Sequence, residues 1–340
     1  MADVPRISVV IVAYGAEDWL ERSVEACLAS DGASVDVVLV DNGCTDGAVD
    51  RLDGRDGVTI VRPGRNLGFA AGCNRGVETS TAPVVALVNP DAVVEPDALA
   101  ALADRLADPG IGIATGCVVL ADRPDLLNSA GNEIHFTGMS WSGHFEEAVA
   151  DHRDERDVFA ASGALCAVRR EVWDHLGGFD ETFFAYYEDA QLSVRCWQQG
   201  WRVVYVPVAR VSHRYEFSRR PQKMELLERN RWQLVLTCYG GRLLAATLPV
   251  LLTFEVAVVA MAAVQGWLPQ KLRSWGWLVR HAADLRARRR AAQLARTVLD
   301  RSLVGLFAED LAPANVDQPA GLATVSGAYR AWWRLVRRAV

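Results

Sequence analysis

Apolar runs alternate with helix-like patterns over the first 120 residues of the chain. The apolar runs lie at residues 7–13, 35–40, 58–61, 84–88 and 111–120. They are almost continuously hydrophobic, which is typical of strands covered on both faces. Between them, apolar residues recur at helical spacing at 17–29, 69–79 and 97–107. Repeated strand–helix alternation predicts a mostly parallel sheet with helices on both faces.

The pattern changes after residue 120. Residues 121–157 are polar and have little periodicity, so we expect an irregular excursion there. Strand and helix patterns then resume at 165–168, 169–176, 189–199 and 202–206. Together these segments predict one Rossmann-like α/β domain over residues 1–215.

Residues 216–340 predict a different kind of region, helical, basic and apolar. The stretch 243–264 contains one charged residue, Glu255, and one proline, Pro249. Its length permits a membrane span, but a carboxylate near the middle makes a span costly. We therefore favour two re-entrant or surface-lying helices broken near Pro249 over a single span.

Charge is divided unevenly along the chain. Residues 1–200 contain 14 Lys and Arg against 33 Asp and Glu, whereas residues 201–340 contain 22 against 9. A basic half with apolar runs suits anionic lipid head groups. Nucleic acid is disfavoured, because the chain lacks a regular basic stripe with stacking aromatic residues.

Aromatic and cationic residues alternate in the basic half, at Trp267, Lys271, Arg273, Trp275, Trp277 and Arg280. Such mixing is typical of a membrane–water interface, so peripheral contact with a membrane is expected. The alternative is a soluble helical subdomain with tryptophans in its core.

Cysteine usage and the N-terminal segment both indicate the cytoplasm. The seven cysteines are odd in number and form no CxxC pair, so we expect free thiols in a reducing compartment. The segment MADVPRISVV lacks the basic-then-apolar pattern of a secretory signal.

Polar motifs follow the predicted strands, and ligands bind at the carboxyl ends of strands in a parallel sheet. The second strand ends in DNGCTDG, where Asp41 either contacts a nucleobase or ribose or caps a turn. After the third strand comes RNLGFAAGCN, whose small residues allow either close approach of a ligand or tight helix–sheet packing. Neither GxGxxG nor GxxxxGK[ST] occurs, which argues against dinucleotide enzymes and P-loop NTPases.

Carboxylates occur at two further positions with catalytic potential. Asn89-Pro90-Asp91 ends the fourth strand, and a carboxylate there can hold a divalent cation that bridges a diphosphate. Glu188 and Asp189 either form an acidic helix start or include a general base. His213 follows an apolar strand and is either a structural histidine or a third metal ligand.

Five motifs together resemble the family-2 glycosyltransferases with the GT-A fold. They are ISVVIVAYG, VDNGCTDG, RNLGFAAGCNRG, NPDAVVEPDAL and GGFDETFFAYYEDAQLSVRCWQQG, and they occur in the family's order and spacing. The resemblance covers about residues 7–215 and is nearest to bacterial rhamnosyl- and galactofuranosyl-transferase-like members that build cell-envelope glycans. It implies a GT-A domain over residues 1–215, and the charge and apolar pattern described above predicts a helical, membrane-associating extension over 216–340.

The resemblance also implies a role for each motif. The residues expected around the nucleotide are Tyr14, Gly15, Asp41, Asn66, Gly68, Gly72 and Asn89. Asp91 and His213 would hold Mg²⁺ or Mn²⁺ under the diphosphate. The floor of the sugar and acceptor region would be formed by Ser162, Gly163 and Ala164. Asp189 would be the catalytic base, and Glu188 would shape the acceptor site.

Two positions depart from the family pattern. Asn89 stands where the DxD-type motif has its first carboxylate, although its amide still offers an oxygen. Gln191 stands where many relatives carry an acidic residue, two positions after the Glu-Asp pair. The base is therefore assigned to Asp189.

The reaction implied is a metal-dependent single displacement that inverts the anomeric centre. The donor would be a nucleotide sugar, with dTDP-rhamnose or a UDP-sugar favoured and GDP-sugars open. The acceptor would be a hydroxyl of a polyprenyl-linked or cell-envelope glycan at the inner face of the cell membrane.

Two other functions are weighed against transfer. A nucleotidyltransferase needs a basic, glycine-rich loop after the first strand, where this chain has AYGAEDWLER. A non-catalytic nucleotide-sugar-binding or scaffold protein would not need Asp91, Glu188, Asp189 and His213 together.

Overall fold

The computed structural model describes residues 4–214, 221–311 and 322–340, which form two compact units. The first unit contains the described residues up to Asn132, Ser142–Cys196, and those from Trp201 to 214. The second contains Glu133–Trp141, Trp197–Gly200 and the described residues from 221 onward. The predicted boundary between 215 and 216 stays a prediction, because it lies outside the described residues.

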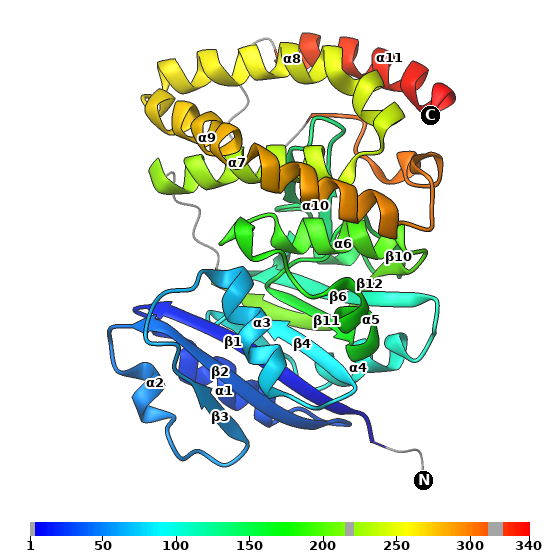
Figure 1. The fold of residues 1–340 in the computed structure, drawn as a ribbon. Coiled ribbons are helices and arrows are strands. Elements are labelled where there is room, and N and C mark those ends of the chain that lie inside the picture. The colour runs from blue at the N-terminus through cyan, green and yellow to red at the C-terminus, as the bar shows by residue number, and fades with distance from the viewer. Residues whose placement is uncertain (1–3, 215–220, 312–321) are drawn as a thin grey trace. The chain divides into compact units, whose positions relative to one another are not determined.

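A ten-stranded mixed sheet forms the centre of the first unit, in the order β10-β12-β6-β11-β4-β1-β2-β3, with β5 on β12 and β7 on β6 (Figure 1). Its strands are β1 (Arg6–Gly15), β2 (Ser34–Cys44), β3 (Val58–Val61), β4 (Val84–Val88), β5 (Ala92–Val94), β6 (Ile111–Leu120), β7 (Arg123–Ser129), β10 (Arg156–Asp157), β11 (Leu165–Arg169) and β12 (Arg202–His213). The short strands β8 (Asn132–Ile134) and β9 (Ser140–Ser142) form a separate pair.

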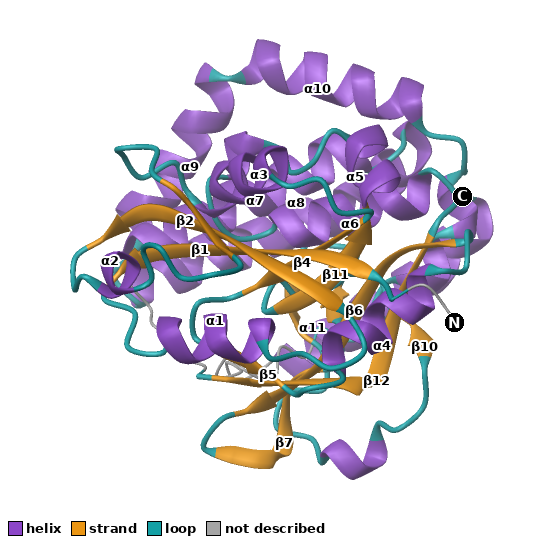
Figure 2. Ribbon diagram, turned by 90° about the horizontal axis from the view of Figure 1, so that it is seen from below, coloured by secondary structure: helices purple, strands orange, loops and turns teal. Residues whose placement is uncertain are grey.

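Helices cover both faces of the large sheet, as predicted. They are α1 (Leu20–Leu28), α2 (Ala48–Arg51), α3 (Phe69–Thr79), α4 (Ala98–Leu106), α5 (Arg170–Leu176) and α6 (Glu188–Gln198), with the short 3₁₀ turns η1 (Val149–Asp151) and η2 (Glu181–Phe183). Figure 2 shows α1 and α4 on one face and α3 and α5 on the other.

The sheet is parallel only in part. Strands β3, β2, β1 and β4 pair in parallel, as the alternation of patterns predicts. Strand β11 instead lies antiparallel between β4 and β6. The long segment between β6 and β11 allows the chain to enter this position in reverse. That segment was expected to be irregular but contains β7, η1 and β10.

Glycines in α3 allow this helix to lie very close to the sheet. A Cβ atom on Gly72 would lie 2.8 Å from a methyl carbon of Val12, and one on Gly76 would lie 2.4 Å from a methyl carbon of Val10. Both valines are buried in β1. Of the two interpretations of RNLGFAAGCN, tight packing therefore explains Gly72. The seven cysteines are all free thiols, as predicted.

The second unit is helical. Its elements are α7 (Pro221–Cys238), α8 (Gly241–Val264), α9 (Leu268–Arg280), α10 (Ala282–Ala295), α11 (Leu322–Ala339) and the 3₁₀ turns η3 (Asp300–Ser302) and η4 (Val304–Leu306). The predicted break near Pro249 is wrong, because α8 continues through this proline. Proline removes the helical hydrogen bond to the carbonyl four residues earlier. That carbonyl belongs to Ala245, which is exposed, so water can hydrate it.

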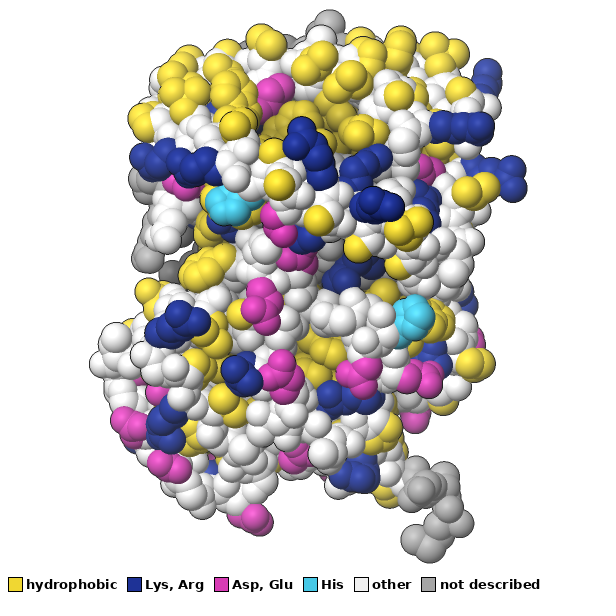
Figure 3. All heavy atoms as spheres, in the orientation of Figure 1, with side chains coloured by type: hydrophobic (Ala, Val, Ile, Leu, Met, Phe, Trp, Pro, Cys, Tyr) yellow, Lys and Arg dark blue, Asp and Glu magenta, His cyan; other side chains and the backbone are white. Residues whose placement is uncertain are grey.

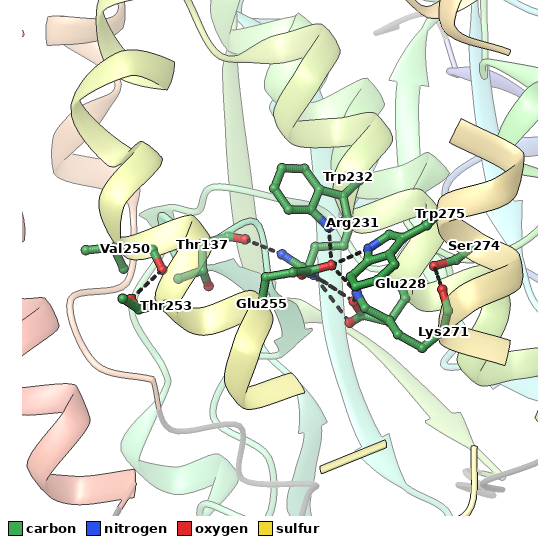
Figure 4. Close-up of polar contacts among 10 residues, drawn as sticks. All are labelled: Thr137, Glu228, Arg231, Trp232, Val250, Thr253, Glu255, Lys271, Ser274 and Trp275. Carbon is green, nitrogen blue, oxygen red and sulfur yellow. Dashed lines mark hydrogen bonds and ion pairs between the residues drawn. The ribbon is translucent and has the colours of Figure 1, made fainter. Parts of the chain in front are cut away.

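A buried ionic cluster joins α7, α8 and α9 (Figure 4). Glu255 of α8 pairs with Arg231 of α7 and Lys271 of α9, and both cations also pair with Glu228. The two carboxylates and two cations balance in charge. Burial raises the pKa of Glu228, but Arg231 and Lys271 outweigh this effect and hold it at about 2. The carboxylate in the apolar helix is therefore accommodated by protein partners.

Trp275, one of the tryptophans expected at a membrane interface, contributes to this cluster together with Trp232. The indole N–H groups of Trp232 and Trp275 donate to Oε1 of Glu255, over 3.1 and 2.5 Å. The guanidinium of Arg229 lies 4.7 Å from the ring centre of Trp277. Packing within the unit thus involves Trp275 and Trp277, and contact with a membrane stays a prediction.

We expect Arg231→Met to destabilise the helical unit by about 3–5 kcal/mol, because it leaves two carboxylates buried near a single cation. Denaturant unfolding followed by tryptophan fluorescence measures this, since Trp232 and Trp275 report on the cluster. The matched control is Arg273→Met, which removes a surface pair with Glu225 from an arginine side chain that is 56% exposed. Its effect should stay below about 1 kcal/mol. Equal effects of the two changes would contradict this account of the cluster.

Candidate active site

The register of β5 on β12 brings three predicted residues together at one edge of the sheet. His213 is paired with Ala92, so Asp91 lies beside the histidine. Nε2 of His213 is 3.2 Å from Oδ1 of Asp91 and 3.4 Å from Nδ2 of Asn89. The structure thus groups the residues that sequence reasoning assigned to a metal and its nucleotide.

A second-layer contact orients the imidazole of His213. Its Nδ1 lies 2.8 Å from Oδ1 of the buried Asn128. A proton on Nδ1 would donate to this oxygen and leave the lone pair of Nε2 directed at Asp91. An imidazole lone pair and a carboxylate oxygen 3.2 Å apart suit a shared divalent cation. Asn128 was not predicted, because only the paired strands bring it to His213.

A further acidic side chain, Glu17, interacts electrostatically with Asp91. Burial raises the pKa of Glu17 to about 7, and the charges of Asp91, Asp46 and Asp18 add to the rise. The backbone N–H of Glu17 donates to Asp46 over 2.8 Å. Crowded carboxylates make the local potential negative, which favours a cation. Glu17 was not predicted as a site residue, although an acidic residue just after β1 is a signal of a binding site.

The residues expected around the base and ribose follow β1 and β2. Tyr14 is exposed, and Gly15 has a φ of 81° that glycine adopts readily. Oδ1 of Asp41 accepts the backbone N–H groups of Gly43 and Cys44, over 3.1 and 3.0 Å. Asp41 therefore caps a turn, which is one of its two interpretations. Its contact with a nucleobase stays a prediction.

A buried amide network fixes the loop before α3. Nδ2 of Asn42 donates to Oδ1 of Asn66 and to the carbonyl of Gly68, over 3.0 and 3.1 Å. Oδ1 of Asn42 accepts the backbone N–H of Leu67. Gly68 has a φ of 83°, and a Cβ there would lie 2.5 Å from the carbonyl oxygen of Phe184. Asn42 holds this loop in place, although sequence reasoning singled out its neighbour Asp41.

Strained backbone leads into α6. Phe184, Tyr186 and Tyr187 have φ values of 65°, 69° and 72°, in the left-handed region that non-glycine residues rarely adopt. The carbonyl of Phe184 accepts the N–H of Ala70 over 3.1 Å. Strain of this kind persists only where surrounding contacts enforce it, and it concentrates at functional sites. Here it sets the direction in which Glu188 and Asp189 enter the helix.

Asp189 is held by donors from three segments. Oδ2 accepts the N–H of Gly163 over 3.1 Å and Nδ2 of Asn132 over 3.3 Å, and Oδ1 accepts the N–H of Ala190 over 2.7 Å. These contacts position both carboxylate oxygens. Asn132 is a further residue that sequence reasoning did not identify.

The two carboxyls of the Glu-Asp pair differ in their surroundings. Burial and the charge of Asp189 raise the pKa of Glu188 well above its ordinary value. Burial also raises the pKa of Asp189, but the N–H groups of Ala190 and Gly163 oppose the rise. Oε2 of Glu188 has no hydrogen-bond partner among the described residues. Glu188 therefore retains a proton more readily, and Asp189 is the better candidate for an ionised base.

Residues 162–164 connect the two halves of the site. The N–H of Asn89 donates to the carbonyl of Ala164 over 3.3 Å, next to the Gly163 N–H that binds Asp189. The backbone N–H of Ser162 donates to the hydroxyl of Thr115. The hydroxyl of Ser162 accepts the N–H of Ala164. The residues predicted for metal, floor and base thus lie along one edge of the sheet.

Residues 5–234 match the family described as glycosyltransferase like family 2. The chain belongs to glycosyltransferase family 2. Among its relatives is an N-acetylglucosaminyl-diphospho-decaprenol L-rhamnosyltransferase from Mycobacterium tuberculosis, 32% identical over an alignment of 242 residues that covers 63% of this chain and 76% of the relative. A glucosyl-dolichyl phosphate glucuronosyltransferase from Haloferax volcanii is 27% identical over 241 residues, or 67% of this chain and 75% of the relative.

Solved structures share the fold of this family-2 enzyme. A mannosyltransferase from Pyrobaculum calidifontis in complex with GDP-Man and Mn²⁺ has a TM-score of 0.53 at 18% identity, over 99% of this chain and 87% of that one. GalNAc-T7 with UDP, GalNAc and Mn²⁺ has a TM-score of 0.57 at 16% identity, over 73% of this chain and 51% of that one. The predicted GT-A fold and glycosyltransferase class are confirmed.

We expect Gly68→Ala to destabilise the sheet unit more than Gly64→Ala. Both glycines have positive φ, so each alanine adds about 1 kcal/mol of backbone strain. Only the change at Gly68 also brings a Cβ against the Phe184 carbonyl, and such overpacking adds about 1–3 kcal/mol. Nothing lies within 4 Å of a Cβ on Gly64. Thermal unfolding followed by circular dichroism compares the two, and equal losses would show that the close approach of Phe184 is unimportant.

Proposed function

We propose that this glycosyltransferase transfers a sugar from a nucleoside diphosphate sugar to a hydroxyl of a polyprenyl-linked acceptor, with inversion and with a bound divalent metal ion. The observation that carries the proposal is Asp189, whose carboxylate is fixed by the Gly163 N–H on the same edge as Asp91 and His213. A base and a cation site on one sheet edge are what a single displacement on such a donor requires.

Asp91 and His213 would hold Mg²⁺ or Mn²⁺, with Asn89 and Glu17 beside them. Two structural neighbours, GalNAc-T7 and the Pyrobaculum calidifontis mannosyltransferase, contain Mn²⁺ together with a nucleotide or nucleotide sugar. A bound ion neutralises charge that develops on a departing diphosphate. The chain's own contribution is a pair of positioned ligands, since Asn128 orients the imidazole and the β5–β12 register places Asp91.

Asp189 would remove the proton from the acceptor hydroxyl as that oxygen attacks the anomeric carbon from the face opposite the diphosphate. The N–H groups of Gly163 and Ala190 keep the carboxylate oriented throughout. Glu188, which retains its proton more readily, would shape the acceptor site beside the base. A single displacement of this kind needs no covalent enzyme intermediate.

For the donor we favour dTDP-rhamnose, with UDP-sugars next. The support is the rhamnosyltransferase relative, whose acceptor is a GlcNAc-diphospho-decaprenol by its name. The glucuronosyltransferase relative is named for a lipid-linked acceptor too. We therefore propose a polyprenyl-diphosphate glycan as the acceptor, in the assembly of a cell-envelope polysaccharide.

Two substitutions separate the metal site from the base. Asp91→Asn should abolish Mn²⁺-dependent thermal stabilisation by the cognate nucleoside diphosphate, because ligands that bind the folded state raise its melting temperature. Asp189→Asn should retain that stabilisation but lower turnover by about 10²–10⁴-fold. Turnover is measured as release of nucleoside diphosphate in the presence of acceptor. Asp174→Asn, an exposed aspartate in α5, is the control and should change neither quantity.

The same assay gives a pH profile. The pKa of Asp189 is raised, so wild-type turnover should fall as pH drops through a midpoint above the ordinary aspartate value of about 3.9. Unchanged turnover in Asp189→Asn would refute the assignment of the base. If Asp91→Asn retains the Mn²⁺-dependent stabilisation by the nucleotide, the assignment of the metal site is refuted.

We also propose that the helical unit contacts the cytoplasmic face of the membrane without spanning it. Helix α8 is long and apolar enough to cross a bilayer, by length and composition only. Its buried face carries Glu255, held by Arg231 and Lys271. Unfolding this cluster to insert α8 would expose paired charges to hydrocarbon, which is costly. An orientation parallel to the surface leaves the cluster intact.

The solvent-exposed side of α8, which adjoins the side that carries Glu255, is apolar (Figure 3). Leu248, Leu252 and Val256 recur every four residues along it, and the exposed fraction reaches 71% at Val256. Helix α11 packs beside α8, where the indole N–H of Trp332 donates to the carbonyl of Ala246 over 2.9 Å. Helix α11 also carries three exposed arginines, Arg334, Arg337 and Arg338, of which the first two pair with Glu309. An apolar stripe on a region with an excess of basic residues suits an anionic lipid surface.

We expect the double substitution Leu252→Lys with Val256→Lys to reduce sedimentation of the full chain with phosphatidylglycerol-containing vesicles by at least about tenfold, because lysine replaces the inserted apolar groups. The control is Val208→Lys, which alters an exposed valine of the sheet unit. Equal sedimentation of both variants would contradict the assignment of this face. Wild-type sedimentation should be weaker with phosphatidylcholine alone.

A further inference from the structure

A second group of metal-ligand side chains lies in the excursion between β6 and β11, outside the residues assigned to transfer. Nδ1 of His144 is 3.1 Å from Oε2 of Glu147, and Nε2 of His152 is 2.7 Å from the same oxygen. One ligand atom from each of the three side chains lies within 4.8 Å of the others. Two imidazoles thus converge on one carboxylate oxygen.

Backbone contacts hold these three residues in place. The N–H of Glu147 donates to the carbonyl of His144 over 3.0 Å, which closes a turn. Leu127 of β7 exchanges backbone hydrogen bonds with this turn, donating to Glu147 and accepting from Glu146. The hydroxyl of Tyr205 in β12 donates to the carbonyl of His152 over 3.1 Å. The ligand atoms are therefore positioned by a sheet, although they lie on a connecting segment.

The turn is also strained. His144 and Glu146 have φ values of 61° and 62°, where asparagine or glycine is usual. Each such residue costs on the order of 1–3 kcal/mol and persists where other interactions enforce it. This conformation places the side chain of His144 against Glu147. The ring centres of His144 and His152 are 4.2 Å apart.

We propose that His144, Glu147 and His152 bind a Zn²⁺ ion that is distinct from the ion at Asp91 and His213. Zn²⁺ binds imidazole nitrogen and carboxylate oxygen at about 2.0–2.2 Å, so tetrahedral ligand atoms lie about 3.4 Å from one another. The observed separations of 3.1 and 2.7 Å need only small side-chain adjustments to reach that value. Two nitrogens and one oxygen suit Zn²⁺, whereas Mg²⁺ prefers oxygen ligands.

The site has a structural role in this proposal. Its three ligands connect the turn beside β7 to the segment that β12 anchors through Tyr205, and a solvent molecule would complete the tetrahedron. Zn²⁺ would offset the strain at His144 and Glu146. The proposal does not depend on sugar transfer, because neither the nucleotide-sugar donor nor Asp189 takes part.

Zn²⁺ titration of the chelator-treated full chain tests this site, with Asp91→Asn present throughout to remove the other metal site. We expect one equivalent to bind and to raise the melting temperature. Co²⁺ in its place should give the intense visible absorption of a tetrahedral complex. His144→Ala and His152→Ala should each weaken Zn²⁺ binding by at least about tenfold. His281→Ala, at an exposed histidine in the second unit, is the matched control and should bind as before.

Glu147→Gln keeps the size of the side chain and a hydrogen-bonding oxygen but removes the anionic ligand. This variant should therefore fold but bind Zn²⁺ more weakly than the unchanged chain. Circular dichroism of the metal-free variants verifies folding. If the Asp91→Asn chain binds no Zn²⁺, or binds it equally in all variants, the three residues form only a hydrogen-bonded network and the proposal is overturned. That result leaves the proposed transferase function untouched, because nucleotide binding is measured separately with Asp91 intact.

Discussion

The antiparallel entry of β11 between β4 and β6 is the constraint on which the active site depends. Its register opposes Leu165 to Val88, so residues 162–164 meet the segment that begins at Asn89. The N–H of Asn89 and the carbonyl of Ala164 join these two segments directly. One residue earlier, the Gly163 N–H reaches Asp189. This strand pairing therefore joins the segment that carries Asp91 to the one that binds Asp189, although the two residues are 98 positions apart in the chain.

The two units use buried carboxylates in opposite ways. In the helical unit, Glu228 and Glu255 each have cationic partners, and their pKa values are lowered. In the sheet unit, Glu17, Glu188 and Asp189 have raised pKa values, and burial is the largest cause for each. A balanced cluster contributes to architecture, whereas unbalanced carboxylates are poised to bind a cation or to accept a proton. The distinction supports catalysis at the sheet edge and a supporting role for the helices.

Much of the fold was predictable because local patterns encode it. The strands at 58–61, 84–88 and 111–120 were predicted with their observed bounds, since buried strands form continuous apolar runs. Strand direction was not predictable, because the reversed β11 has an apolar run like those of the mutually parallel strands β1 and β4. Helix α8 was expected to break because Pro249 is a local signal, yet its packing against α9 and α11 and its ion pair with Arg231 of α7 override it.

The candidate site was predictable where motifs follow strands. Asp91, His213 and Asn89 were named from sequence, and the structure brings them together. Asn42, Asn128 and Asn132 were missed, because a lone asparagine has no signal until a partner from a distant segment is known. Gly72 was recognised as special, but only the 2.8 Å approach of Val12 shows that packing requires it.

The buried ionic cluster of the helical unit has a thermal consequence. Hydration of charged groups becomes less favourable as temperature rises, so the penalty for keeping Glu228, Arg231, Glu255 and Lys271 away from water shrinks on warming. Hydrophobic contacts do not become more stabilising on warming in the same way. The association of α7, α8 and α9 should therefore resist heat better than an apolar interface of similar size would, while giving no such advantage in the cold.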